Sequence, residues 1–195
     1  MVSAYLLSLY NTFINRILIP TPSVCPVSKL TFRFVCKMGT IQQKNTAMIT
    51  IAKYNQNTLP DVNEEKEVIR FLFQELEQYG DPEHQIQKAA DYALGRDGKL
   101  GGWIFVAKEN NNIVSAVIIN ETGMSEYIPE NILVYIATDR EQRGKGIGKK
   151  IMQEVIAHTQ GDIALHVDKE NPARKLYERL GFTTPFLEMR LTKEA

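Results

Sequence analysis

The chain has 195 residues, of which 44% are hydrophobic and 24% charged, which fits one ordinary globular domain and excludes a disordered or fibrous protein. Its formal net charge is zero, but residues 1–60 hold six basic and no acidic side chains, which leaves 17 basic and 23 acidic ones in residues 61–195. An acidic body without a basic cluster argues against nucleic acid as the main partner. Two cysteines exclude a disulfide framework, and no Cys/His group has the spacing of zinc ligands, so we expect no bound metal.

Residues 1–46 are predicted to be an N-terminal extension outside the folded core, with the folded domain over residues 47–195. The first 19 residues are apolar but are interrupted by Asn, Thr and Arg, which makes them a poor transmembrane candidate. They also lack the basic start of a secretory signal. We therefore expect a cytoplasmic protein without a membrane partner. Organellar targeting by residues 1–46 is the alternative, because acidic residues are absent there.

The first half of the predicted domain contains a strand and then two helices. Alternating residues over 49–54 predict a short strand. The first helix starts at a predicted N-cap, Asp61, and ends near Gly80. The second starts at Asp81-Pro82-Glu83, where Asp81 is the expected cap, and ends at Gly95.

The second half is richer in strands. Two β-type runs, 103–107 and 113–119, are joined by a polar connection and predict a hairpin. The nearly continuous apolar run 132–138 predicts a central strand that is covered on both faces. Later patterns predict a helix to about residue 158, a strand at 163–167, a helix at 172–180 and a final strand at 184–191. The predicted order is β-α-α-β-β-β-α-β-α-β, an α/β arrangement.

A glycine-rich segment, QRGKGIGKK, lies at 142–150 between a predicted strand and a helix. Its three alternate glycines allow a sharp turn and close approach of the backbone to a ligand. The first amides of the following helix present the positive end of the helix dipole. Arg143, Lys145, Lys149 and Lys150 add positive charge. The segment therefore predicts an anion site, most naturally for a diphosphate; a tight turn with solvated lysines is the alternative.

The spacing of this segment excludes two common nucleotide motifs. A P-loop needs a Gly five positions before the Gly-Lys-Ser/Thr triplet, but Arg143 stands there and Lys150 replaces the hydroxyl residue. A dinucleotide fingerprint needs G-x-G-x-x-G, and Lys149 occupies the position of its last glycine. Asp168 lies 20 residues after Gly148, as in such folds, but the segment does not belong to a first βαβ unit.

Two motifs resemble those of the GNAT superfamily of N-acetyltransferases. Arg143–Gly148 fits the Arg/Gln-x-x-Gly-x-Gly/Ala loop of that family, and 171–182 is similar to its hallmark N-x-x-A-x-x-x-Y-x-x-x-G-F, with the Ala shifted by one position. The resemblance covers about residues 47–191. It implies a GNAT-like α/β fold, a mixed sheet flanked by helices.

The resemblance also implies a ligand and its contacts. The cosubstrate would be acetyl-CoA, with the strands at 132–138 and 163–167 splayed apart around its pantetheine arm and no metal involved. Backbone amides near Thr138 would polarise the thioester carbonyl as an oxyanion site. The implied cofactor-binding residues are Ile136, Ala137, Thr138, Arg143, Gly144, Lys145, Gly146, Ile147, Gly148, Lys149 and Asn171.

Tyr177 is the catalytic residue that the resemblance implies, as the group that protonates the departing thiolate. A phenol with a pKa of about 10 and a thiol of about 8.5 make full transfer mildly uphill, but a hydrogen bond to the developing sulfur anion already lowers the barrier. The alternative role of Tyr177 is packing of its helix onto the sheet.

The resemblance implies no clear general base. Many members of the family carry a carboxylate on the strand before the glycine-rich turn, and residues 132–138 contain none. Tyr135, a water chain, Glu121 or Glu126 are the open candidates. Family analogy places acceptor selection in the first two helices, where the acid-rich stretch 64–83 would attract a cationic amine; a solvated helix face is the alternative.

The predicted function is acetyl transfer from acetyl-CoA to a primary amine by direct attack in a ternary complex. The partner would be a small-molecule or peptide amine, and a homodimer stays open. The alternative is a catalytically silent module that binds acyl-CoA as a sensor or for assembly, which the missing strand carboxylate favours.

Overall fold

The computed structural model describes residues 48–193, so the predicted extension, residues 1–46, lies outside the described residues. Five strands form one sheet in the order β1-β2-β3-β4-β5. The first four pair antiparallel, and β5 joins β4 in parallel. The strands are β1 (Ile49–Tyr54), β2 (Gly102–Glu109), β3 (Asn112–Glu121), β4 (Asn131–Thr138) and β5 (Ile163–Leu165).

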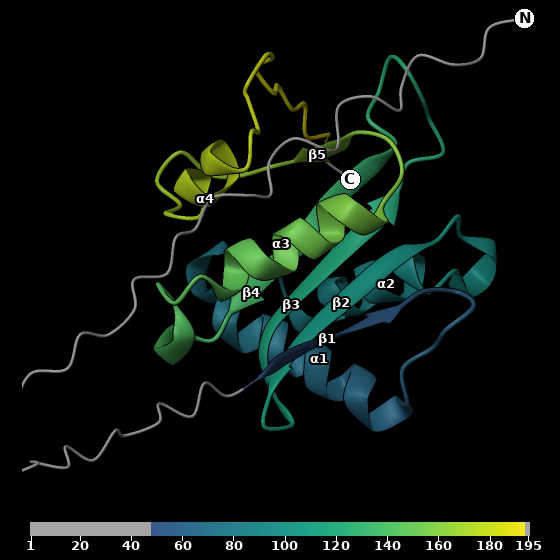
Figure 1. Cartoon of the computed structure of the whole chain (residues 1–195). Coiled ribbons are helices and arrows are strands. Elements are labelled where there is room, and N and C mark those ends of the chain that lie inside the picture. Colours follow the sequence, from purple (N-terminus) through teal and green to yellow (C-terminus); the bar gives the residue numbers. More distant parts are fainter. Residues whose placement is uncertain (1–47, 194–195) are drawn as a thin grey trace, which may run out of the picture. The chain divides into compact units, whose positions relative to one another are not determined.

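Helices cover both faces of this sheet (Figure 1). They are α1 (Val62–Leu76), α2 (Glu83–Ala93), α3 (Ile147–His158) and α4 (Arg174–Arg179), with short 3₁₀ turns η1 (Glu77–Tyr79), η2 (Arg96–Gly98) and η3 (Arg140–Gln142). Helices α1 and α2 lie on one face, α3 on the other, and α4 lies beyond α3, close to β5 (Figure 1). The predicted mixed sheet flanked by helices is confirmed. Over residues 48–193, no helix is long and apolar enough to span a membrane.

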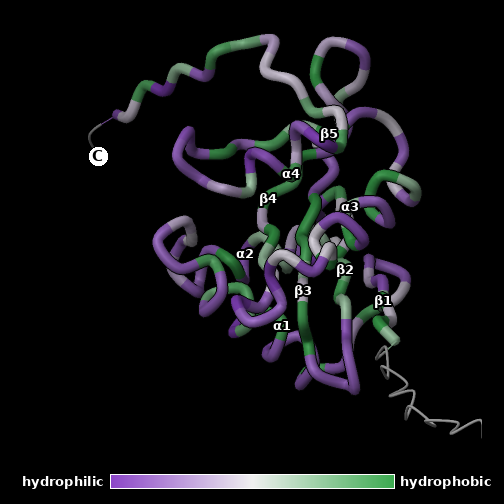
Figure 2. The backbone as a smooth tube through the Cα atoms, turned by 60° about the vertical axis from the view of Figure 1, so that its left-hand side comes forward, coloured by the Kyte–Doolittle hydropathy of each residue, from purple (hydrophilic) through white to green (hydrophobic). Residues whose placement is uncertain are grey.

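Two apolar clusters hold the layers together. The first contains Leu72 and Ile86 from α1 and α2 against Ile118 of the sheet, and the second contains Ile151 of α3 against Phe105. All five side chains are 0% exposed. Figure 2 shows the hydrophobic residues concentrated on the central strands. Burying such side chains is the main favourable contribution to folding.

The sequence predicted that residues 132–138, which form β4, would be covered on both faces. In the structure the strand covered on both faces is β3. Residues 114–119 of β3 are all buried, whereas buried and half-buried residues alternate along β4. The reason is that β5 accompanies β4 for only three residues, so the rest of its outer edge faces a cavity. The continuous apolar run at 132–138 therefore belongs to a strand that borders a cavity and is not covered on both faces.

The C-terminal elements are shorter than predicted. Strand β5 ends at Leu165, α4 spans only Arg174–Arg179, and the described residues after α4 form no strand, so the final strand predicted at 184–191 is absent. In that segment Phe186 is 84% and Met189 94% exposed. Alternating apolar residues become a strand only when an edge pairs with them, and within residues 48–193 β5 pairs with β4 alone.

Candidate active site

Strands β4 and β5 separate partway along their length. They pair at Asn131–Ile163, Ile132–Ala164 and Leu133–Leu165, and no pairing continues beyond these positions. The following residues, 134–138 of β4 and 166–168 after β5, face each other across a cavity. The predicted splaying of the two strands is confirmed. Backbone groups along the outer edge of β4 are consequently free to pair with a ligand.

A β-bulge marks the point of separation. Ile119 of β3 pairs with Leu133, but the preceding Ile118 pairs with Tyr135, so Val134 is an extra residue in β4. Because of this insertion, Leu133 packs in the α3 cluster while both Val134 and Tyr135 pack in the cluster under α1 and α2. Bulges bend a strand and change the direction of its side chains. This bulge turns Tyr135 toward the helices α1 and α2.

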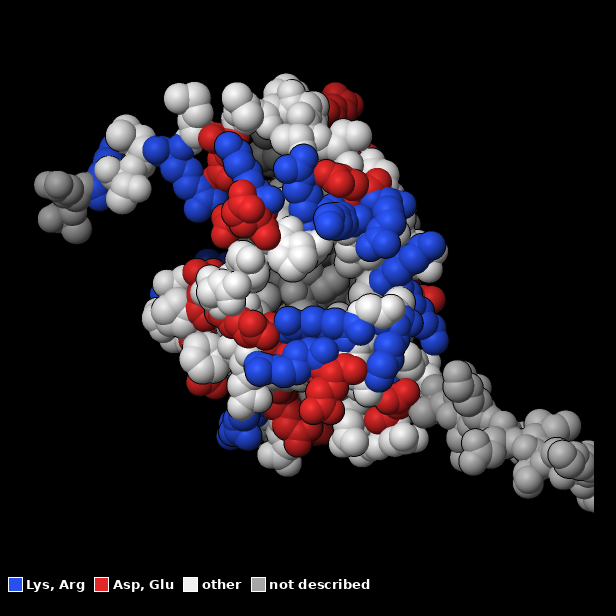
Figure 3. Space-filling view, turned by 90° about the vertical axis from the view of Figure 1, so that its left-hand side faces the viewer, with Lys and Arg blue, Asp and Glu red and all other residues white. Residues whose placement is uncertain are grey.

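The cavity between β4 and the segment after β5, here called the central cavity, has a volume of about 870 Å³. Its walls come from the end of α1 and η1, from β4, from the glycine-rich loop with the start of α3, and from the β5–α4 segment with α4. Figure 3 shows this face hollowed at its centre, with Lys and Arg side chains on both sides of the hollow. The arrangement suits an elongated ligand that carries negative charge.

The glycines of the loop meet two different needs. Gly144 has φ 79° and Gly146 φ 84°, a left-handed conformation that other residues adopt only with strain. A Cβ at either position would have no atom within 4 Å, so the space beside them is open to a ligand. A Cβ at Gly148 would lie 3.3 Å from Leu176 Cδ2, so this glycine permits close packing of α3 against α4.

The first turn of α3 provides an anion site. The helix starts at Ile147 after Gly146, which offers no side-chain cap, and its first backbone bond runs from Lys150 N to Gly146 O at 3.0 Å. The amides of residues 147–149 therefore have no acceptor within the helix. Together with the helix dipole, such amides bind phosphate groups. These residues fit a diphosphate.

The basic side chains of the loop have separate environments. Lys149 lines the central cavity, whereas Lys145 does not and donates to Gln142 Oε1 at 2.8 Å. Lys150 donates to the carbonyl of Ile49 at 3.1 Å, on β1. Every other predicted cofactor-binding residue lines the cavity; Lys145 is the exception.

Arg143 lines the cavity but is already engaged by protein groups. Its guanidinium donates to the carbonyls of Glu75 at 2.8 Å and Thr138 at 3.0 Å. It also forms ion pairs with the carboxylates of Glu75 and Glu77. Arg143 therefore ties the glycine-rich loop to the end of α1.

Tyr177 lies in α4, lines the same cavity and is 6% exposed. Burial raises the pKa of its phenol to about 12, so the group keeps its proton. Its ring meets that of Phe182 edge-on at 5.8 Å between centroids. Asn171 precedes α4, and its Oδ1 accepts a hydrogen bond from Ala173 N at 2.9 Å. Residues of the motif at 171–182 thus form the wall of the cavity opposite β4.

Three acidic side chains from the end of α1 and the α1–α2 connection also line the cavity: Glu75, Glu77 and Asp81. Only this part of the acid-rich stretch reaches the cavity, because Glu64 pairs with Lys108 at 2.7 Å and Glu65 with Arg96. The candidate bases Glu121 and Glu126 do not line it, whereas Tyr135 does.

Asp81 was predicted to cap α2, but the N-cap of that helix is Pro82 and no side chain caps it. The Asp81 carboxylate instead accepts a hydrogen bond from the Tyr135 hydroxyl at 2.6 Å. The sequence placed Asp81 in the acid-rich stretch that would attract a cationic amine but did not predict this contact, because the partner is 54 positions away and is turned toward it by the bulge.

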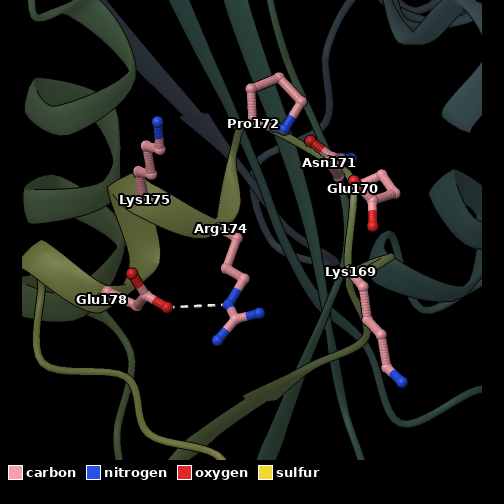
Figure 4. A pocket seen from close by; sticks show the side chains of 7 residues that line it. All are labelled: Lys169, Glu170, Asn171, Pro172, Arg174, Lys175 and Glu178. Carbon is pink, nitrogen blue, oxygen red and sulfur yellow. Dashed lines mark hydrogen bonds and ion pairs between the residues drawn. The ribbon is translucent and has the colours of Figure 1, made fainter.

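A second hollow of about 380 Å³, here called the α4 pocket, adjoins the central cavity through shared residues Asn171 and Pro172. Figure 4 shows Arg174 pointing into the space between α4 and the preceding segment, where it meets Glu178, and Lys175 on another side of the helix. The Arg174 Nε–Glu178 Oε1 distance is 2.8 Å. Over the described residues, no cluster of three or more His, Cys, Asp or Glu could hold a metal ion.

Part of the domain is similar to known proteins. Residues 101–184 match the family model of the acetyltransferase (GNAT) domain. The chain is 38% identical over 84 residues to the 5-NmdU N-acetyltransferase of Pseudomonas phage PaMx11, a match that covers 42% of this chain and 58% of the relative's length.

Solved structures share the fold. An aminoglycoside N-acetyltransferase, AAC(6')-Iy in complex with CoA, superimposes with a TM-score of 0.54 at 14% identity, over 76% of this chain and 97% of the other. The structure of PH1933 from Pyrococcus horikoshii OT3 gives a TM-score of 0.55 at 24% identity, over 73% and 93%. These identities show the fold alone. Residues 101–184, which include the glycine-rich loop and the splayed strands, are thus similar to the acetyltransferase (GNAT) domain, and the fold is that of GNAT acetyltransferases.

Proposed function

We propose that the protein transfers an acetyl group from acetyl-CoA to a primary amine, by direct attack of the amine in a ternary complex. The observation that carries this proposal is the continuous central cavity. It joins the free amides of α3 to Tyr177 along the unpaired edge of β4.

Each wall of the cavity has a part in this reaction. The amides of residues 147–149 and the side chain of Lys149 would hold the diphosphate of CoA. The outer edge of β4 would pair with the pantetheine arm, and amides near Thr138 would stabilise negative charge on the thioester oxygen. Tyr177, whose pKa of about 12 keeps it protonated, would donate to the sulfur as the C–S bond breaks.

The relatives support an amine as the acceptor. Both the phage protein and AAC(6')-Iy are named N-acetyltransferases, one for 5-NmdU and the other for aminoglycosides. The chain spans only 58% of the phage protein's length, so the acceptor is assigned here as a class, a primary amine.

The test is to incubate the full chain with acetyl-CoA and an amine panel while free thiol is followed. The panel contains 5-NmdU, an aminoglycoside, spermidine and a lysine-bearing peptide. We expect thiol release that depends on at least one amine and an equal amount of N-acetylated product by mass spectrometry. Binding of acetyl-CoA without turnover of any amine would contradict the proposal and favour a silent acyl-CoA-binding module.

A further inference from the structure

The central cavity is lined by groups of both charges. The glycine-rich loop and the start of α3 present backbone amides and Lys149, which suit the phosphates of the cosubstrate. The end of α1 and the α1–α2 connection present the carboxylates of Glu75, Glu77 and Asp81, and Asp168 adds a fourth from the segment after β5. The proposed function uses the positive groups and leaves the carboxylates of the α1–α2 connection without a role.

Two of these three carboxylates are neutralised by arginine. Glu75 Oε2 lies 3.3 Å and Glu77 Oε1 3.2 Å from nitrogens of Arg143, and Arg140 lies 3.6 Å from Glu77 Oε1. Asp81 has no basic group within ion-pair distance in residues 48–193. An ammonium group that approaches the α1–α2 connection would therefore meet one carboxylate without an ion pair, that of Asp81.

The fold holds Asp81 in a specific position. Its side chain does not cap α2, although Asp is a favoured cap and the adjacent helix start has none. It accepts instead the hydroxyl proton of Tyr135 in a 2.6 Å hydrogen bond. The β4 bulge at Val134 makes this contact possible, since it places Tyr135 on the α1–α2 side of the sheet.

Tyr135 acts as the donor in this pair. Its side chain is 8% exposed, and burial, followed by the hydrogen bond to Asp81, raises the pKa of the phenol above its ordinary value. The phenol therefore stays protonated and is excluded as the base itself. A carboxylate has several lone pairs, so one hydrogen bond from Tyr135 leaves Asp81 able to accept another from a ligand.

We infer that Asp81, held by Tyr135, binds the ammonium group of the acceptor and accepts the proton that the amine must lose before it attacks. This inference rests on the proposed function and names the base that the sequence of β4 lacks. Tyr135 is next to Ile136 in the chain, so the carboxylate is held beside the strand residues that would receive the acetyl group.

The reaction balances with these groups. One proton moves from R-NH₃⁺ to Asp81 and then to solvent, to which Asp81 is exposed. The amine lone pair forms the C–N bond with the acetyl carbon, and the C–S bond breaks. The sulfur takes a proton from Tyr177, and the second proton lost by nitrogen restores Tyr177. The products are the N-acetylamine, CoA as its thiol, and one proton.

The proton transfer to Asp81 is uphill in water, because an alkylammonium has a pKa of about 10.4 and an aspartic acid about 3.9. Transfer between the two groups removes both charges at once. Release of the proton from the exposed Asp81 to solvent then draws the transfer forward. Asp81 therefore selects cationic amines and also permits their deprotonation.

The test compares Asp81→Asn with Glu83→Gln, using the fastest amine of the panel as the probe. Both changes remove one negative charge at the start of α2, but Glu83 does not line the cavity. For Asp81→Asn we expect kcat/KM for the amine to fall by at least about 100-fold, as is typical when an acid–base group is lost. The dissociation constant for acetyl-CoA should stay within about twofold in both variants, which shows that the fold is intact.

Tyr135→Phe is the second variant, because it keeps the carboxylate and removes only its partner. We expect a smaller loss than for Asp81→Asn, again with unchanged acetyl-CoA binding. The inference is overturned if Asp81→Asn retains wild-type kcat/KM for the amine, or if Glu83→Gln loses as much. Failure of the proposed function is a different result, in which the wild-type protein releases no thiol with any amine.

Discussion

Tyr177 combines burial with access to the cavity, a combination that a purely structural tyrosine does not need. It is 6% exposed, packs against Phe182 and yet lines the central cavity. Burial alone raises its pKa to about 12, so the phenol remains a proton donor at neutral pH. These properties fit the proposed role of Tyr177 as the donor of a proton to the leaving thiolate.

Removal of the Tyr177 hydroxyl should therefore affect the chemical step and not binding. For Tyr177→Phe we expect kcat to fall by about 100-fold with the acetyl-CoA dissociation constant unchanged, because the ring still fills its place against Phe182. Tyr127→Phe is the matched control, since Tyr127 is 81% exposed and does not line the cavity. Steady-state kinetics and calorimetric titration measure the two quantities. Wild-type kcat in Tyr177→Phe would assign this residue to packing.

The same pKa predicts a change of stability in alkaline solution. A phenol of pKa about 10 when unfolded and about 12 when folded contributes about 3 kcal/mol of stability below pH 10, and this contribution is lost as the pH rises through 12. Denaturant unfolding of the wild-type protein and Tyr177→Phe between pH 9 and 12 measures it. We expect the stability difference between the two proteins to shrink with rising pH; a constant difference would mean that Tyr177 ionises as freely in the folded state.

Individual residues also show where sequence reasoning succeeds and where it fails. The glycines of the loop and Tyr177 belong to local motifs, so their positions in the cavity could be predicted from spacing. The contact of Asp81 with Tyr135 could not be predicted, because the two residues are 54 positions apart and the sequence placed Asp81 only within the acid-rich stretch 64–83. Lys145 was predicted to bind the cofactor as a member of the glycine-rich motif, but it does not line the cavity and its side chain donates to Gln142.

The start of α3 is the element on which the proposed cosubstrate binding depends most. Gly146 is its N-cap, with φ 84° and open space where a side chain would lie. The amides that follow it have no acceptor within the helix, which makes this turn the natural place for a diphosphate.

An alanine at this position should weaken both folding and binding. We expect Gly146→Ala to lower the free energy of unfolding by about 1–2 kcal/mol, the cost of a left-handed non-glycine residue, and to weaken acetyl-CoA binding at least about tenfold. Gly98→Ala is the control, because Gly98 has φ 71° and equally open surroundings but lies in η2, outside the cavity. Equal binding by the two variants in calorimetry would disprove the anion site at α3.

At the level of elements, the sequence predicted the type and order of almost every helix and strand. It could not predict the bulge at Val134, because an apolar run carries no sign of an extra residue in the pairing. It also overestimated the C-terminal end, where the alternating residues 184–191 form no strand. Both errors concern strand pairing, which depends on a neighbouring strand distant in the chain.

The whole molecule divides its charges in a way that the formal net charge of zero conceals. Within residues 48–193, the cavity is lined by the α3 amides and Lys149 and also by carboxylates. The presence of both charges suits the proposed reaction between an anionic cosubstrate and a cationic acceptor.

The central claim, that the cavity binds acetyl-CoA through a diphosphate on α3, is tested most directly by calorimetric titration of the full chain with acetyl-CoA and with S-acetylpantetheine. The second ligand keeps the thioester and the arm but lacks the diphosphate. Hydrogen bonds to a charged group contribute about 1.5–3 kcal/mol each, and about 1.4 kcal/mol corresponds to a tenfold change in affinity. We predict that acetyl-CoA binds at least about tenfold more tightly; equal affinity for the two ligands, or no binding of acetyl-CoA, would contradict the account.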